Sequence, residues 1–344
     1  MAFFTDEGWE APAHWCRIRT IEMHTGGEPL RVITAGLPPI VGRTVLEKRR
    51  YFREHYDHLR TGLMWEPRGH ADMYGAVVLR SESADFDVFF LHNEGYSTMC
   101  GHAIIALTTL ALELQARPDG GDARELTINV PAGTVHARGA MEGGRVREVF
   151  FRNVPSFVFL RDRSIEVPGL GEVRFDIAYG GAFYAIIEAA PLGLALGPQE
   201  YGRLIDYGRR IKQAIVKHYP IAHPTESELS FLYGTIFTGA AVDPGHHSRN
   251  VTVFADGEID RSATGTGVSA RAALLHARGE LRSGDTITIE SILGSTMTVR
   301  CVEESRLGSH AAIIPEVSGT AHVIGRSEFC FDPDDPLNRG FFLR

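Results

Sequence analysis

The stretch NEGYSTMCGHAIIALTTLALEL, residues 93–114, decides the fold class. Its last twelve residues are apolar or small almost all the way round, which is typical of a helix that is buried on every side. The stretch ATGTGVSARAALLHA, residues 263–277, predicts a second buried helix over residues 268–277. Cys100 stands just before the first helix, and Thr264 stands at the matching place before the second.

The two stretches belong to an internal repeat. Each predicted helix is followed by a turn and a strand, LTINVPAGTV in the first case and ITIESILGST in the second. Cys100 and Thr264 stand 164 positions apart, which is too long for a solenoid unit and is the length of a whole domain. The fold class is therefore predicted as α/β (α+β), with two similar domains that face each other.

The chain length fits this division, because 344 residues is about twice the size of a typical domain. We place the domains at residues 1–153 and 154–320, and we expect the C-terminal strand, about 321–344, to return to the first domain. Apolar residues at three- and four-residue spacing predict amphipathic surface helices over residues 46–60 and 199–218. Short strands rich in Val, Ile, Phe and Thr are predicted at residues 87–92, 126–130, 149–151, 157–160 and 251–255.

The composition is that of an ordinary globular protein. Hydrophobic residues make up 44% of the chain and charged residues 23%, which excludes a disordered or collagen-like chain. The formal net charge of −8 argues against nucleic acid and against a membrane surface as partners, since both need a basic face. The N-terminus lacks the basic and apolar regions of a signal peptide, and no run approaches the ~18 apolar residues of a membrane helix. We therefore expect a cytoplasmic protein with a small-molecule partner.

Cysteine and histidine spacing predicts no metal site. The four cysteines form no CxxC pair, and the fifteen histidines show no HExxH pattern. Cys100 has a different context, because a thiol at the first turn of a helix lies on unpaired N–H groups and at the positive end of the helix dipole, which lowers its pKa. The sequence therefore predicts a thiolate at Cys100, with an inert buried cysteine as the alternative.

The matching helix start in the second half is suited to an anion. The run Thr264-Gly265-Thr266-Gly267 leaves backbone N–H groups open, as helix starts that bind anions do. If the two helix starts meet across a cleft, they form a carboxylate-binding site with one thiol and one hydroxyl on opposite faces.

Five motifs carry a resemblance to the proline racemase family. They follow one another in the family's order and span roughly residue 18 to the C-terminus: MHTGGEPLR at 23–31, EPRGHADMYGA at 66–76, NEGYSTMCGHA at 93–103, DIAYGGAFYA at 176–185 and DRSATGTGVSAR at 260–271. The resemblance implies the diaminopimelate epimerase-like fold, in which two pseudo-symmetric domains each curl a sheet around a central helix and the active site lies in the cleft between them.

The chain departs from the family's racemases at one position. Racemases and epimerases of the family place cysteine at both helix starts, because inversion needs one group to remove a proton and a second to deliver one on the opposite face. Here Thr264 stands in place of the second cysteine, and an alkanol hydroxyl is too weak an acid for that role. The pair of Cys100 and Thr264 is similar to the branch of the family that eliminates water, and it implies dehydration of trans-3-hydroxy-L-proline to Δ1-pyrroline-2-carboxylate. The alternatives are a racemase or 4-hydroxyproline epimerase and a non-catalytic binder of proline-type amino acids.

The resemblance also implies roles for neighbouring residues. Asp260 would receive the ring nitrogen of the substrate, with a turn aspartate as the alternative. Four further residues would hold the substrate: Gly101, His102, Gly265 and Thr266. His102 could instead pack or cap, and Thr264 could be a helix cap only. Neither a cofactor nor a metal is expected, and a homodimer is left open.

Overall fold

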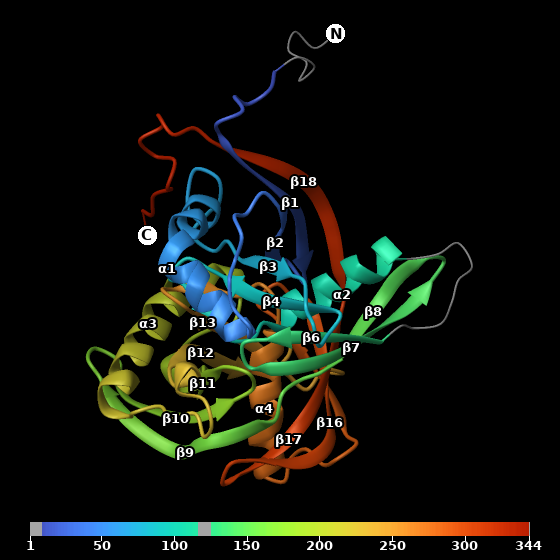
Figure 1. The fold of residues 1–344 in the computed structure, drawn as a ribbon. Helices are drawn as coiled ribbons and strands as arrows, with labels where there is room; N and C mark the ends of the chain where they lie inside the picture. Colours follow the sequence, from blue (N-terminus) through green and yellow to red (C-terminus); the bar gives the residue numbers. More distant parts are fainter. Residues whose placement is uncertain (1–8, 116–124, 344) are drawn as a thin grey trace.

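The computed structural model describes residues 9–115 and 125–343, and it shows one unit of strands and helices that occurs twice (Figure 1). The elements of the first unit are β1 (Cys16–Thr25), β2 (Glu28–Ala35), α1 (Val45–Met64), β3 (Gly75–Leu79), β4 (Phe86–Leu91), β5 (Tyr96–Ser97), α2 (Gly101–Gln115), β6 (Glu125–Val130), β7 (Gly133–Glu142) and β8 (Arg145–Arg152). The second unit repeats this order with β10 (Gly171–Tyr179), β11 (Phe183–Glu188), α3 (Tyr201–His218), β12 (Leu232–Gly239), β13 (Ser248–Phe254), β14 (Glu258–Ile259), α4 (Gly265–Ala277), β15 (Thr286–Glu290), β16 (Thr296–Leu307) and β17 (His310–Gly319). Strands β9 (Ser156–Val167) and β18 (Ala321–Phe331) complete the two units.

Strand pairing follows the same plan in both units. Parallel pairs join β2 to β3 and β4 to β6 in the first unit, and they join β11 to β12 and β13 to β15 in the second. In the second unit the pairings run β9, β10, β11, β12, β13, β15, β16, β17 and back to β9, so the strands close into a ring. Strand β17 also pairs with β8, and the two units therefore share one continuous sheet.

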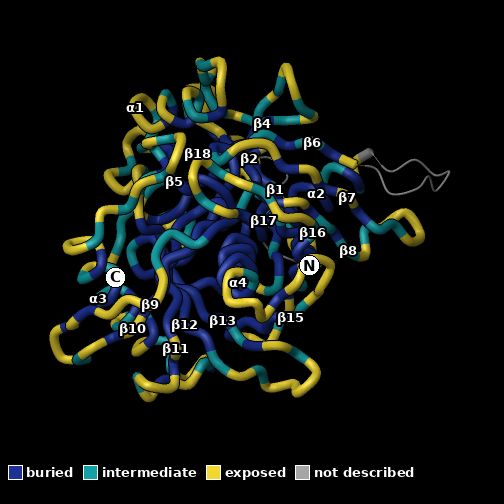
Figure 2. Tube along the Cα trace, turned by 90° about the horizontal axis from the view of Figure 1, so that it is seen from below, coloured by how far each residue is buried: buried dark blue, intermediate teal, exposed yellow. Residues whose placement is uncertain are grey.

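Each unit packs its strands around one helix. Helix α4 is buried along its whole length from Gly265 to Leu275, and Figure 2 shows it in the middle of the strands around it. Helix α2 has the same position in the first unit, where it packs on β1, β7, β8 and β18. These two are the segments whose sequence is apolar or small all the way round, so the prediction of two buried helices is confirmed.

The amphipathic helices lie on the outside, as predicted. Helix α1 extends four residues beyond the expected end at residue 60, and α3 begins two residues after the expected start because a short turn at Pro198–Glu200 precedes it. The five predicted strands correspond to β4, β6, β8, β9 and β13. Strand β18 runs antiparallel to β1, which brings the C-terminal segment back to the first unit (Figure 1).

The chain passes from the first unit to the second between β8 and β9. The domain boundaries at residues 153/154 and 320/321 stay predictions, as do the homodimer and the cytoplasmic location. In the described part of the chain, no helix is both long enough and apolar enough to cross a membrane.

Candidate active site

The N-termini of the two enclosed helices touch each other. A Cβ atom on Gly101 would lie 2.5 Å from the Cα atom of Gly265, and a Cβ on Gly265 would lie 2.6 Å from the Cα of Gly101. Real Cβ atoms do not approach so closely, so this contact requires glycine at both positions. It places the positive ends of two helix dipoles at one point.

Cys100 and Thr264 occupy equivalent backbone positions at these helix starts. The carbonyl of Cys100 accepts the first helical hydrogen bond of α2, from the N–H of Ile104 at 3.0 Å, and the carbonyl of Thr264 accepts the corresponding bond of α4, from Val268 at 2.7 Å. The equivalence predicted from the repeat is therefore present in three dimensions.

The side chain of Thr264 makes no capping hydrogen bond to its helix. The interpretation of the Thr264 hydroxyl as a helix cap is therefore wrong. Its Oγ1 instead donates to Oγ1 of Thr252 at 2.8 Å. The φ angle of Thr264 is +68°, a left-handed value that is strained for a β-branched residue. Strain of this kind persists where the surrounding structure holds the residue in place, and it clusters at functional sites.

A small cavity of about 20 Å³ lies where the helix starts meet. All seven site residues that the sequence predicts line it: Cys100, Gly101, His102, Asp260, Thr264, Gly265 and Thr266. Five further residues complete the lining: Tyr74, Met99, Tyr184, Tyr233 and Phe254. The structure thus brings the predicted residues together, while their individual roles stay proposals.

The tyrosines and Phe254 were not predicted as site residues, although two of the tyrosines lie in motifs quoted for the resemblance. Tyr74 is the third-last residue of EPRGHADMYGA, and Tyr184 lies in DIAYGGAFYA. The hydroxyl of Tyr184 shares a hydrogen bond of 2.7 Å with Oγ1 of Thr266. The sequence around Tyr233 and Phe254 carries no signal of a site, because both lie in ordinary strand patterns.

Burial raises the pKa of the Cys100 thiol well above its ordinary value, and the nearby carboxylates of Asp260 and Glu28 raise it further. The N–H of Ala103 and the hydroxyl of Tyr74 act in the opposite direction but do not outweigh burial. Burial therefore acts against the thiolate expected from the helix dipole, because desolvation disfavours the charged form. The thiolate at Cys100 stays a prediction.

His102 faces the thiol as a neutral ring. Its Nδ1 lies 3.1 Å from Sγ of Cys100, and burial lowers the pKa of His102 to about 3. The ring also has a hydrogen bond to the backbone of Pro29, and the backbone carbonyl of His102 accepts from the hydroxyl of Thr25 at 2.8 Å. These contacts fix the ring beside the sulfur. Contact with substrate, the role expected for His102, stays a prediction.

A buried carboxylate also lines the cavity. Asp260 is buried, and its Oδ1 accepts the N–H of Ser262 at 2.7 Å. Burial raises the pKa of Asp260, and that hydrogen bond acts in the opposite direction. Glu28 lies close behind, where it accepts the N–H of Arg261 at 2.7 Å, and burial and Asp260 together raise the pKa of Glu28 well above its ordinary value. Asp260 is therefore the carboxylate among the residues that line the cavity, and its pairing with the ring nitrogen stays a prediction.

Comparison with known proteins places this site in a family. The family model for proline racemase matches residues 20–342. The trans-3-hydroxy-L-proline dehydratase of Colwellia psychrerythraea is 51% identical, with 95% of this chain and 93% of that protein covered. The 3-hydroxyproline 2-epimerase of Burkholderia multivorans is 44% identical, with coverage of 95% and 98%. A crystal structure of a hydroxyproline epimerase from Agrobacterium vitis with bound trans-4-hydroxy-L-proline superposes with a TM-score of 0.90 at 31% identity, covering 96% of each chain.

These similarities confirm the fold expected from the five motifs, a diaminopimelate epimerase-like architecture with two related units around two central helices. The family model covers nearly the whole chain, and the relatives match it from end to end. The chain belongs to the proline racemase family.

Proposed function

We propose that this protein is a hydro-lyase that converts trans-3-hydroxy-L-proline to Δ1-pyrroline-2-carboxylate. One observation carries the proposal: of the two equivalent helix starts, one supplies the thiol of Cys100 and the other supplies only the hydroxyl of Thr264. That hydroxyl already donates a hydrogen bond to Thr252. A site with one acid–base group at the two helix starts suits elimination better than inversion. The relative from Colwellia psychrerythraea bears the name of this activity at 51% identity.

The stereochemistry of the substrate matches a single base. In trans-3-hydroxy-L-proline the C3 hydroxyl lies on the ring face opposite the carboxylate, so it shares a face with the Cα hydrogen. One group on that face can serve both reacting positions. In the proposal Cys100 occupies that face and takes the Cα proton.

In the proposal, the two charges of the zwitterion bind at separate places in the site. The substrate carboxylate would bind the N–H groups at the starts of α2 and α4, which have no acceptor within their helices. The ring ammonium would pair with Asp260. Both contacts stabilise the carbanion that develops at Cα, since they hold positive charge next to it.

In the proposal, binding of the substrate also favours ionisation of the Cys100 thiol. The ammonium brings a cation beside Asp260 and Glu28, the two carboxylates that raise the pKa of the thiol. An added cation favours the thiolate, so in the proposal the thiol proton passes to water while the lining is open to admit the zwitterion. His102 keeps the sulfur in position through the 3.1 Å contact.

The proton taken from Cα leaves with the hydroxyl. The thiolate of Cys100 becomes a thiol when it removes the Cα proton, and it returns that proton to the C3 oxygen as the C3–O bond breaks. Water and an enamine are formed, and the thiolate is restored. The enamine then tautomerises to Δ1-pyrroline-2-carboxylate. The 20 Å³ cavity holds about one water molecule, so the lining must move to admit the substrate.

Epimerisation at C2 is the second candidate function, because the relative from Burkholderia multivorans is named a 3-hydroxyproline 2-epimerase at 44% identity. Incubation with trans-3-hydroxy-L-proline and with trans-4-hydroxy-L-proline distinguishes dehydration from epimerisation. The products are identified by mass spectrometry and chiral chromatography. We expect loss of water from the first compound only. Inversion of either compound without loss of water would overturn the proposal.

The raised pKa of Cys100 gives a testable pH dependence. Without substrate, the rate at which iodoacetamide alkylates Cys100 should rise about tenfold per pH unit between pH 7 and 9, because the thiol is protonated throughout that range. Peptide-resolved mass spectrometry separates Cys100 from Cys16, Cys301 and Cys330. A rate that stays constant from pH 6 to 8 would mean that a thiolate is already present. The helix dipole would then affect the pKa of Cys100 more than burial does.

Thr264→Cys restores two thiols at the two helix starts. The variant is expected to invert proline or trans-4-hydroxy-L-proline slowly, because a second acid–base group then faces Cα while the surrounding residues are unadapted. The parent should not racemise L-proline. Chiral chromatography of L-proline after incubation with each protein makes the comparison, and D-proline formed by the parent would contradict the role given to Thr264.

A further inference from the structure

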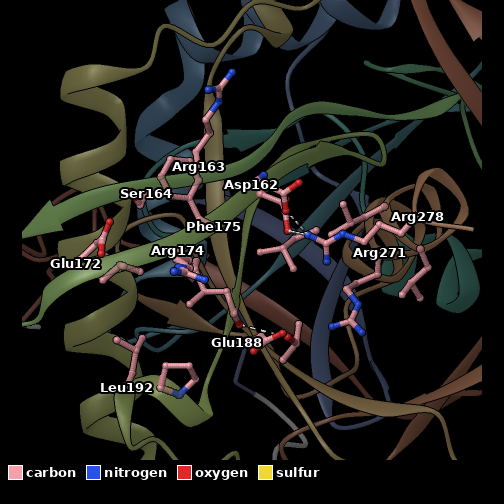
Figure 3. Close-up of a pocket in the computed structure, with 18 of the residues that line it drawn as sticks. Asp162, Arg163, Ser164, Glu172, Arg174, Phe175, Glu188, Leu192, Arg271 and Arg278 are labelled. Atoms are coloured by element: carbon pink, nitrogen blue, oxygen red, sulfur yellow. Dashed lines mark hydrogen bonds and ion pairs between the residues drawn. The ribbon is translucent and has the colours of Figure 1, made fainter. Parts of the chain in front are cut away.

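A second, larger cavity lies in the second unit, away from Cys100. It has a volume of about 910 Å³ and shares no lining residue with the cavity at the helix starts. Strands β9, β10 and β11 form one side, and the second half of α4 forms another (Figure 3). Its size is in the range of pockets that hold small organic ligands.

Arg271 is the unusual residue of this cavity. It lies on α4, seven residues after Thr264, and only 8% of its surface is exposed. Its Nε has no hydrogen-bond partner, and Nη2 makes only a long contact of 3.4 Å with Oγ of Ser248. Among the described residues, no carboxylate lies within 4.0 Å of its guanidinium. Burial lowers the pKa of Arg271 to about 10, so the group remains a cation at neutral pH.

A buried cation without a counter-ion is costly, and proteins tolerate it where a ligand supplies the missing charge. Arg278, at the end of the same helix, is different because it already pairs with Asp162 at 3.0 Å and Asp176 at 2.9 Å. Among the described residues that line this cavity, Arg271 is therefore the buried guanidinium without an ion pair, whereas Arg163 and Arg174 are exposed.

Three carboxylates that line the cavity have no ion pair within 4.0 Å among the residues that the structure describes: Glu172, Glu188 and Glu280. The charges of Glu280 and Glu188 both act on Arg271, and Glu188 ends β11. In Figure 3, Arg271 and Arg278 come from the helix on one side, and Arg174 and Glu188 come from the strands. A phosphate would be repelled by these carboxylates, whereas a zwitterion offers an anion to Arg271 and a cation to a glutamate.

We propose that this cavity is a second binding site, for a zwitterionic α-amino acid with an apolar side chain. Its carboxylate pairs with Arg271 and its ammonium with Glu188. Pro191, Leu192 and Leu274 line the cavity and supply apolar contacts for the side chain. The inference does not rest on the proposed function, since it uses none of the residues around Cys100.

Isothermal titration calorimetry on the full chain tests the proposal with L-leucine and L-phenylalanine as probes and inorganic phosphate as the comparison. The parent is expected to bind at least one amino acid saturably and to bind phosphate more weakly. Arg271→Met and Glu188→Gln should weaken amino acid binding roughly tenfold or more, since each removes a charge-assisted hydrogen bond. Two variants serve as controls: Arg163→Met at the exposed rim and Asp260→Asn at the other cavity. Their dissociation constants for the amino acid should stay within about twofold of the parent's.

Thermal unfolding without ligand distinguishes a binding role of Arg271 from a structural one. Removal of an unpaired buried charge should leave the melting temperature of Arg271→Met unchanged or raise it. Glu188 is exposed, so Glu188→Gln tests the site even if Arg271→Met does not fold. The proposal is overturned if neither amino acid binds at tens of millimolar, if phosphate binds more tightly, or if only Asp260→Asn loses binding.

Discussion

Cys100→Ser is expected to lose the dehydration of trans-3-hydroxy-L-proline by at least about three orders of magnitude, since a serine hydroxyl is hardly ionised at neutral pH. The fold should remain, because serine is close to cysteine in size and is a favourable residue at a helix N-cap. The measurement is steady-state formation of Δ1-pyrroline-2-carboxylate, with circular dichroism and thermal unfolding as checks on the fold.

Cys301 provides the matched control for this variant. It is the other fully enclosed cysteine among the described residues, and it lies on β16, outside the cavity lining. Cys301→Ala should lose some stability to the space it leaves but keep catalytic efficiency near that of the parent. Near-normal turnover of a folded Cys100→Ser protein would end the assignment of Cys100 as the base.

Asp260→Asn has the second largest expected effect. The substitution keeps the size of the side chain and removes its charge, so the ring ammonium loses a charge-assisted hydrogen bond in a buried site. The loss should be about 1.5–3 kcal/mol, roughly ten- to a hundredfold in kcat/KM. Steady-state kinetics on trans-3-hydroxy-L-proline measures it.

Pyrrole-2-carboxylate separates the charge of Asp260 from its shape. This planar compound resembles the carbanion but carries no charge on nitrogen, so it cannot form the ion pair. Its inhibition constant should change much less on Asp260→Asn than kcat/KM does. Equal losses for inhibitor and substrate would show that Asp260 shapes the pocket instead of pairing with the ring nitrogen.

The sequence predicts the central helices and the site they form because both depend on local pattern. A helix enclosed by strands needs apolar or small residues on every face, and residues 101–115 and 265–277 show this directly. The repeat then places Cys100 and Thr264 at equivalent positions.

Properties that depend on distant segments could not be read from the sequence. The raised pKa of Cys100 comes from complete burial and from Glu28, which lies far away in the chain. The close contact between Gly101 and Gly265 requires glycine at two positions for which the sequence indicated only a role in holding the substrate. Arg271 stands in a quoted motif as well, but its missing counter-ion is visible only once the residues around it are placed.

Chiral analysis of the unreacted substrate during turnover tests the central claim, which is that one base acts on one face. At half conversion of trans-3-hydroxy-L-proline, the remaining substrate should keep its configuration while Δ1-pyrroline-2-carboxylate accumulates. Accumulation of cis-3-hydroxy-D-proline faster than Δ1-pyrroline-2-carboxylate would contradict the account, because it requires a proton to be delivered from the face of Thr264.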